Sequence, residues 1–162
     1  MAVTKVEQRK RLQRNEEKWS RTLMDAGWTV IPSVILESQK ALGLDPIDVN
    51  ILLQLATYWW YPENLPHPSK ATLASSIGVD PSTVRRHIAR LEADGLIERE
   101  ARFDRKTGRQ ETNRYSFDGL IKEATPYAKE ALAEREDRRL ENAARRERKK
   151  PKLQIIRGKT KK

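Results

Sequence analysis

Apolar and polar residues follow helical spacing in two short stretches of this chain, one on each side of a turn. The first stretch begins after Ser69, a residue type that commonly caps helices, and its apolar members are Leu73 and Ile77. Gly78 comes next and can adopt the left-handed conformation in which many helices end. The pattern therefore predicts a short helix between Ser69 and Gly78.

The second stretch begins with Asp80 and Pro81, the residue types preferred at the N-cap and at the first position of a helix. Three apolar residues define its buried stripe: Val84, Ile88 and Leu91. Gly95 ends the pattern, and Leu96 and Ile97 are expected to begin a strand. Two helices joined by a short turn, the second of them basic, are typical of a helix-turn-helix.

The opposite face of the second helix combines long hydrogen-bond donors with small residues. At about 100° per residue, this face carries Ser82, Arg86, Ala89, Arg90 and Ala93, with Thr83 and Arg85 on its flanks. Arginine can donate two hydrogen bonds to guanine in the major groove, and small residues let a helix approach the bases. The alternative is a surface helix whose arginines are only solvated, but the capped turn and the following strand favour DNA reading.

A predicted hairpin follows, with arms at residues 96–103 and 110–117 and a turn at 104–109. Alternating apolar residues are expected to share its packed face: Phe103, Tyr115 and Phe117. The turn carries three cations: Arg105, Lys106 and Arg109. A basic hairpin after a recognition helix is suited to the phosphate backbone or the minor groove, although such a hairpin standing alone would be an ordinary solvated loop.

The stretch TLASSIGVDPSTVRRHIARLEADGLIERE, with KTGRQETNRYSF after it, resembles the winged helix-turn-helix domains of bacterial, plasmid and phage proteins. These include GntR- and MarR-type regulators and, more closely in the wing, replication-associated DNA-binding proteins. The resemblance covers about residues 45–117. It implies a three-helix core with a small sheet, and DNA contacts from the second motif helix and the wing. A second domain of the GntR kind is not recognisable, so no small-molecule ligand is expected.

The predicted DNA-binding residues are polar or basic and belong to both motif helices and the wing. They are Ser69, Lys70, Ser82, Thr83, Arg85, Arg86, Arg90, Arg105, Lys106 and Arg109. No catalytic residue, metal ligand or cofactor is predicted.

Upstream of the motif, Asp45 and Pro46 repeat the cap signature before an apolar helix expected over residues 47–61. Its terminal aromatic residues are expected to pack in the core rather than form a base-stacking platform, with one ring possible at a subunit interface: Tyr58, Trp59 and Trp60. A helix is also expected over residues 34–42, ended by Gly43, after an extended segment at 27–32.

Two charged helices are expected to flank the domain. One runs over residues 5–26, and the other begins at Thr125 and Pro126, after a short helix capped by Asp118, and continues toward Arg148. The sequence thus predicts a mainly α protein with a small β wing, a winged helix-turn-helix domain with helical extensions at both ends. The expected boundaries are 1–27 for the first helix, 28–118 for the domain, 119–148 for the last helix and 149–162 for a flexible basic tail.

Charge and composition narrow the function. The net charge is +10, and residues 145–162 alone carry ten Lys or Arg and one Glu, so the excess lies in a segment suited to neutralising phosphates. The chain has no cysteine, two separated histidines and no phosphate-binding glycine loop, which argues against an enzyme or a zinc site. Neither a membrane span nor a signal peptide is expected, and a cytoplasmic location at the bacterial nucleoid or a plasmid fits.

These features favour a sequence-specific double-stranded DNA-binding protein that represses or regulates transcription in a bacterium or on a mobile element. Plasmid or phage replication initiation or partition is an alternative within DNA binding, and a winged-helix factor that holds a protein partner is one of another class. A homodimer is expected, because such proteins commonly read two half-sites. Its candidate contacts are Leu12, Trp19 and Leu23 at one end and Tyr127, Ala131, Leu132 and Leu140 at the other.

Overall fold

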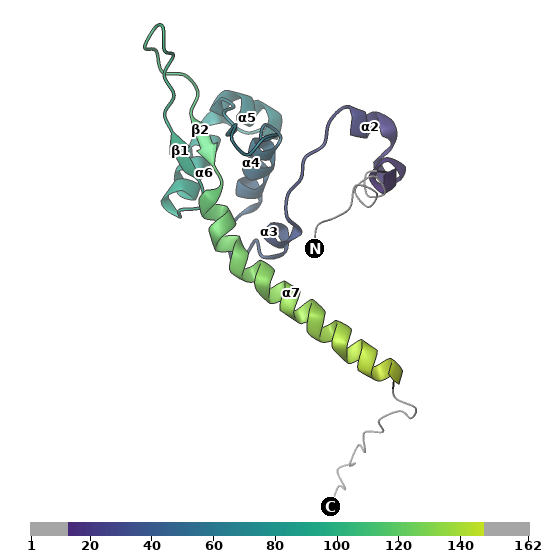
Figure 1. Ribbon diagram of the computed structural model, residues 1–162. Coiled ribbons are helices and arrows are strands. Elements are labelled where there is room, and N and C mark those ends of the chain that lie inside the picture. Colours follow the sequence, from purple (N-terminus) through teal and green to yellow (C-terminus); the bar gives the residue numbers. More distant parts are fainter. Residues whose placement is uncertain (1–12, 148–162) are drawn as a thin grey trace, which may run out of the picture. The chain divides into compact units, whose positions relative to one another are not determined.

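The computed structural model describes residues 13–147 (Figure 1). The chain divides into two compact units, Met1–Thr125 and Pro126–Lys162. Two predicted features lie outside the described residues, the start of the N-terminal helix with Leu12 and the basic tail at 149–162. Among the helices in the described part, none is long and apolar enough to cross a membrane.

Three helices of the first unit, α4 (Pro46–Ala56), α5 (Lys70–Ile77) and α6 (Pro81–Ala93), pack against one another. Helix α4 starts with a capping box, in which Asp45 accepts from the backbone N–H of Asp48 while the Asp48 carboxylate accepts from the N–H of Asp45. The helix ends at Ala56, earlier than predicted, because the N–H groups of Tyr58 and Trp59 donate to carbonyls three residues back, in a tighter turn than that of an α-helix.

The two helices of the motif begin and end where their caps predicted. The backbone N–H of Thr72 donates to Ser69 Oγ at 2.9 Å, and the N–H of Ser82 donates to Asp80 Oδ1 at 2.7 Å. Gly78 has φ of 80°, a left-handed conformation that a residue with a Cβ rarely adopts. A tight turn therefore aims α6 away from α5, as a helix-turn-helix requires.

The core of the first unit lies between these helices and the base of the wing. Val84, Ile88 and Leu91 are fully buried, as predicted from their spacing. The other buried apolar residues come from α3, α4, α5, β2, the start of α7 and the adjoining loops: Ile35, Leu44, Val49, Ile51, Leu52, Leu55, Leu73, Ala74, Leu96, Ile97, Tyr115, Phe117, Leu120 and Ala124.

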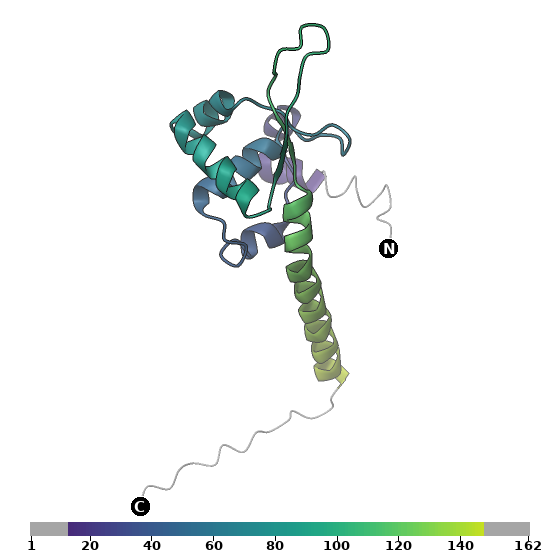
Figure 2. The same ribbon diagram turned by 90° about the vertical axis from the view of Figure 1, so that its left-hand side faces the viewer.

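The wing consists of β1 (Glu98–Glu100) paired antiparallel with β2 (Arg114–Ser116). The predicted strand start at residues 96–97 is wrong, since these two residues are buried in the loop that precedes β1. Farther out, Phe103 pairs with Gln110, one residue out of step with the β1–β2 register. The returning arm therefore contains one extra residue, a bulge. The arm extends beyond α4–α6 in both views (Figure 1 and Figure 2).

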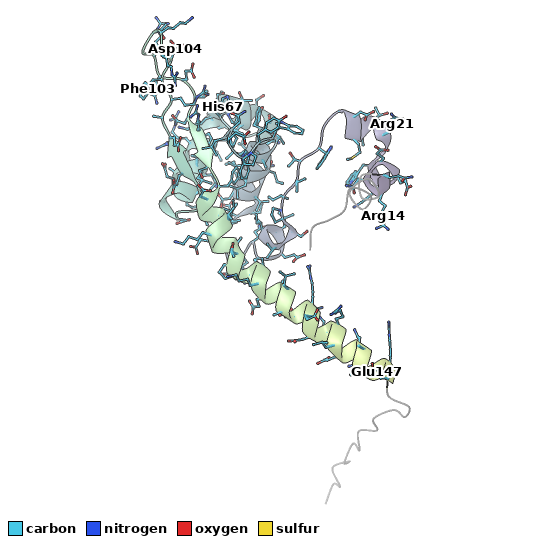
Figure 3. All side chains as sticks on the ribbon, in the orientation of Figure 1. Arg14, Arg21, His67, Phe103, Asp104 and Glu147 are labelled. Carbon is cyan, nitrogen blue, oxygen red and sulfur yellow. The ribbon has the colours of Figure 1, made fainter. Side chains whose placement is uncertain are left out.

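Phe103 corrects the predicted packed face of the hairpin. Tyr115 and Phe117 are buried as expected, but Phe103 is 62% exposed. It lies on the part of the arm that has passed the helices, where no core faces it (Figure 3).

Helix α7 (Asp118–Glu147) is continuous through Pro126, so the predicted break at this residue is wrong. Proline removes one backbone donor and its ring crowds the carbonyl four residues back, which usually disfavours a helix interior, yet the helical turns continue on both sides of Pro126. The side chain of Thr125 donates to the carbonyl of Ile121 at 2.6 Å just before it. In the first unit, the N–H of Leu120 donates to the carbonyl of Leu96 at 2.8 Å and ties the start of α7 to the loop after α6.

The N-terminal segment is less regular than predicted. Residues 13–19 are helical, Ser20 interrupts the helix with φ of 73°, and α2 (Arg21–Asp25) follows. After a stretch without regular structure, α3 (Ser33–Glu37) covers only the first half of the second predicted helix, and turns follow up to Gly43.

The aromatic residues after α4 divide between core and surface. Trp59 stacks on Phe117 with ring centroids 5.1 Å apart, as expected for a core ring. Trp60 and Tyr58 are 63% and 43% exposed, so their predicted core position is wrong.

Candidate nucleic-acid interface

The outer face of α6 is exposed, narrow and basic. Its buried side consists of Val84, His87, Ile88 and Leu91. On the opposite side Ser82, Arg85, Arg86, Ala89 and Ala93 are exposed. Arg86 lies near the middle of this face, because it follows Ser82 by four residues and precedes Ala93 by seven. Among the predicted base-reading residues it has the position best suited to a groove.

Arg90 has a different position from the one predicted. Its guanidinium donates to Asp45 Oδ2 at 2.8 Å and also pairs with the buried carboxylate of Asp48. Both partners belong to the start of α4, so Arg90 links the recognition helix to the core. A guanidinium held in this way is not free to read bases, so Arg90 is not among the proposed base contacts.

His87 joins the same cluster, which the sequence interpretation did not find. Its Nδ1 lies 2.8 Å from Asp48 Oδ1 and 3.6 Å from Asp45 Oδ2. The sequence indicated a role for Asp48 only within its own helix, because Asp48 occupies the third position after the cap, where a capping box needs an acceptor. The long-range pairing with α6 had no comparable signal.

The ligand-type atoms of Asp45, Asp48 and His87 lie within 4.8 Å of one another, close enough for a metal ion. The Arg90 guanidinium already supplies a positive charge to both carboxylates. The cluster is therefore satisfied as an ion-pair network that positions α6.

A second group of charges gathers where α5, α6 and β1 meet. Partial burial lowers the pKa of Lys70, and the positive charges of Arg99 and Arg85 lower it further. Arg99, on β1, was not among the predicted site residues, and it forms an ion pair of 3.0 Å with Glu92. A lysine whose charge is disfavoured by neighbouring cations is a suitable place for an anion.

A groove of about 250 Å³ lies beside this group. It is lined by the start of α5 and the returning arm of the wing: Pro68, Ser69, Lys70, Gln110, Glu111, Thr112, Asn113 and Tyr115. The structure thus brings the predicted residues Ser69 and Lys70 next to the wing.

The tip of the wing is organised around one carboxylate. Asp104 Oδ1 accepts from the backbone N–H of Lys106 at 2.9 Å, and from the N–H and hydroxyl of Thr107 at 2.6 and 2.8 Å. These hydrogen bonds, those of Thr107 first, lower the pKa of Asp104. The three cations predicted at the tip, Arg105, Lys106 and Arg109, are exposed around this fixed turn.

Comparison with known proteins gives the class. A family described as a helix-turn-helix domain matches residues 42–97, which span α4, α5 and α6. With the two-stranded sheet that follows, the chain contains a winged helix-turn-helix domain, and this motif is a DNA-binding motif. No curated protein sequence matches the chain.

Among solved structures, the N-terminal domain of DnaD protein from Geobacillus kaustophilus HTA426 is 19% identical with a TM-score of 0.51, covering 74% of this chain and 96% of that one. YusO protein from Bacillus subtilis is 19% identical with a TM-score of 0.41, covering 88% and 94%. MarR is 25% identical with a TM-score of 0.36, covering 70% and 88%. Of these three, the DnaD domain supports a shared fold.

Proposed function

We propose that this protein binds double-stranded DNA in a sequence-specific way and regulates transcription, as a repressor, in the cytoplasm of a bacterium or on a mobile element. The outer face of α6 carries this proposal, because it presents Arg86 between small residues while its opposite side is anchored in the core. A helix of this kind enters the major groove with its exposed side toward the base edges.

The proposed contacts divide by what they read. Arg86 reads bases, and Ser82, Thr83 and Arg85 contact bases or phosphates at the edge of the groove. The wing cations bind the backbone or the minor groove. Ser69 and Lys70 bind phosphate at the start of α5.

The proposed functional form is a homodimer. Two copies related by a two-fold axis place two recognition helices on successive half-sites, about 10 base pairs apart or a multiple of this. A palindromic target is therefore expected.

Selection of bound duplexes from a random pool tests the proposal with the full chain. We expect enrichment of one palindromic sequence, and loss of preference at a few positions in each half-site when Arg86→Ala is used in a parallel selection. Equal recovery of all sequences would contradict sequence-specific reading. The genomic position of the enriched sequence then separates the roles, since sites in promoters support repression and clustered sites at an origin support replication initiation.

A further inference from the structure

An exposed apolar surface covers part of the first unit and has no role in the proposed DNA contacts. We call it the aromatic surface. Its members are exposed by 44 to 71% and come from residues 13–30 and from the segment after α4: Trp19, Leu23, Trp28, Val30 and Trp60. The N-terminal residues among them belong to the segment that leads through α2 toward α3 (Figure 1).

The aromatic surface is continuous and hollowed in two places. One hollow, of about 390 Å³, is lined by Trp19, Leu23, Met24 and Trp28 among others. The other, of about 220 Å³, is lined by Trp28, Val30, Ala56, Trp59 and Trp60 together with Thr29. Because Trp28 and Thr29 line both, the two hollows adjoin.

The surface is large for one that a monomer exposes. A covered aromatic side chain buries 150–250 Å², so the three tryptophans, each about half exposed, present on the order of 250–400 Å², and Leu23 and Val30 add to this. Apolar patches of about 300–600 Å² are the largest on a typical monomer and are often functional. Isolated exposed residues do not reach this area.

The charge of the segment favours a copy of the same chain over nucleic acid. Residues 13–30 contain three cations and three anions, so the segment has no net charge although the chain carries +10: Arg14, Lys18, Arg21, Glu16, Glu17 and Asp25. A two-fold interface brings identical surfaces together, and a neutral surface does so without repulsion. The segment also offers both projecting apolar side chains and apolar hollows, which reciprocal contact requires.

We propose that a second copy of this chain covers the aromatic surface, with α2 and residues 13–19 of each copy seated against Trp28 and Trp60 of the other. The inference rests on the proposed function, because two half-sites call for two copies. It selects the N-terminal segment, and not Leu132 and Leu140 of α7, as the dimer contact.

Analytical ultracentrifugation of the full chain over a wide concentration range tests this. We expect a mass of twice 18.8 kDa, and a rise of at least 100-fold in the dimer dissociation constant for Leu23→Glu with Trp60→Glu. Val30→Glu, at a residue 71% exposed and outside any helix, is expected to weaken the dimer without affecting folding.

Matched controls keep the test specific. Phe103→Glu places the same charge at a residue as exposed as Trp60, 62% against 63%, and should leave the dimer intact. Leu132→Glu with Leu140→Glu should also leave it intact. Two results would overturn the proposal. One is a monomeric full chain, which would assign the surface to another protein or to a terminal segment of the same chain. The other is a dimer that dissociates in the Leu132→Glu, Leu140→Glu variant but not in the variants of the aromatic surface.

The outcome is separable from that of the proposed function. If the interface is right and DNA reading is wrong, Leu23→Glu with Trp60→Glu gives a monomer while the unaltered dimer shows no sequence preference. If DNA reading is right and the interface is wrong, the full chain prefers one palindrome and the same variant binds it as tightly.

Discussion

Arg86 and Arg90 lie four residues apart on α6, yet their side chains have different surroundings. Arg86 is exposed on the outer face, whereas Arg90 is paired with Asp45 and Asp48 of α4. We expect Arg86→Ala to cost about 1–3 kcal/mol of binding free energy on the selected DNA and much less on random DNA. Fluorescence anisotropy titrations with both duplexes measure this difference.

Arg90→Ala is the contrasting variant. It removes the same charge from the same helix, but its main expected effect is a lower free energy of unfolding, with a similar loss of affinity on both duplexes. An equal loss on both duplexes for Arg86→Ala would instead identify that residue as a phosphate contact.

Asp48 is expected to contribute strongly to stability. Its carboxylate is buried, caps α4 and accepts from His87 while pairing with Arg90, so Asp48→Ala leaves several groups without a partner. We expect a loss of about 3 kcal/mol in the free energy of unfolding, the lower end for a broken buried pair, because Arg90 can still reach water. Urea unfolding measures it. Glu134→Ala, which breaks an exposed pair with Arg138, should change it by less than about 1 kcal/mol.

At the scale of single residues, local chemistry was predictable and distant pairing was not. Ser69, Gly78 and Asp80 were identified as caps because each acts on neighbours within a few positions. The partners of Arg90 lie more than forty residues earlier in the chain. Helical periodicity assigned Arg90 to the outer face of α6, because it carries no information about which other element packs beside the helix.

The wing is the element through which electrostatic binding is best tested. Arg105→Ala with Arg109→Ala should weaken binding to most sequences, because the tip is expected to neutralise phosphates. The plot of log affinity against log salt should become shallower by about 0.9 for each phosphate that the variant no longer neutralises. Arg135→Ala with Arg146→Ala removes the same charge from α7 as a control. An unchanged slope for the wing variant would show that the wing stands away from DNA.

The junction between α6 and α7 depends on a close approach of two glycines. A Cβ at Gly119 would overlap the carbonyl oxygen of Gly95, which is backbone and has little freedom to move. We expect Gly119→Ala to lower the free energy of unfolding by several kcal/mol, more than the roughly 1–2 kcal/mol of conformational strain expected for Gly78→Ala, where nothing lies near the added atom. Thermal unfolding of the two variants gives the comparison.

Among the elements, the motif helices were predicted best and the ends of longer helices worst. For α6 the N-cap, the proline at the first position and the buried apolar stripe all predict the same helix. In α7 the proline suggested a break, but the turns on either side of it continue the helix. The bulge on the returning arm and the exposure of Phe103 could not be predicted, because alternation along a hairpin shows neither an extra residue nor where an arm leaves the core.

For the whole molecule, the uneven distribution of charge leads to a prediction about residues 145–162. Ending the chain at Ala144 removes a net charge of +9. The shortened protein should keep its melting temperature and its preferred sequence while losing non-specific affinity, and this loss should shrink as salt rises. Binding to random duplexes at several salt concentrations measures it. A changed sequence preference would show that this segment takes part in reading the target.

The turn centred on Asp104 has a consequence for the speed of recognition. A flexible basic loop must lose conformational freedom each time it meets a duplex, and part of its attraction is offset by that ordering. Three hydrogen bonds to one carboxylate hold the wing tip in shape before any encounter. The cations of the tip therefore need no further ordering when the protein meets DNA. We expect Asp104→Ala to slow association in stopped-flow measurements, even though it adds a net positive charge.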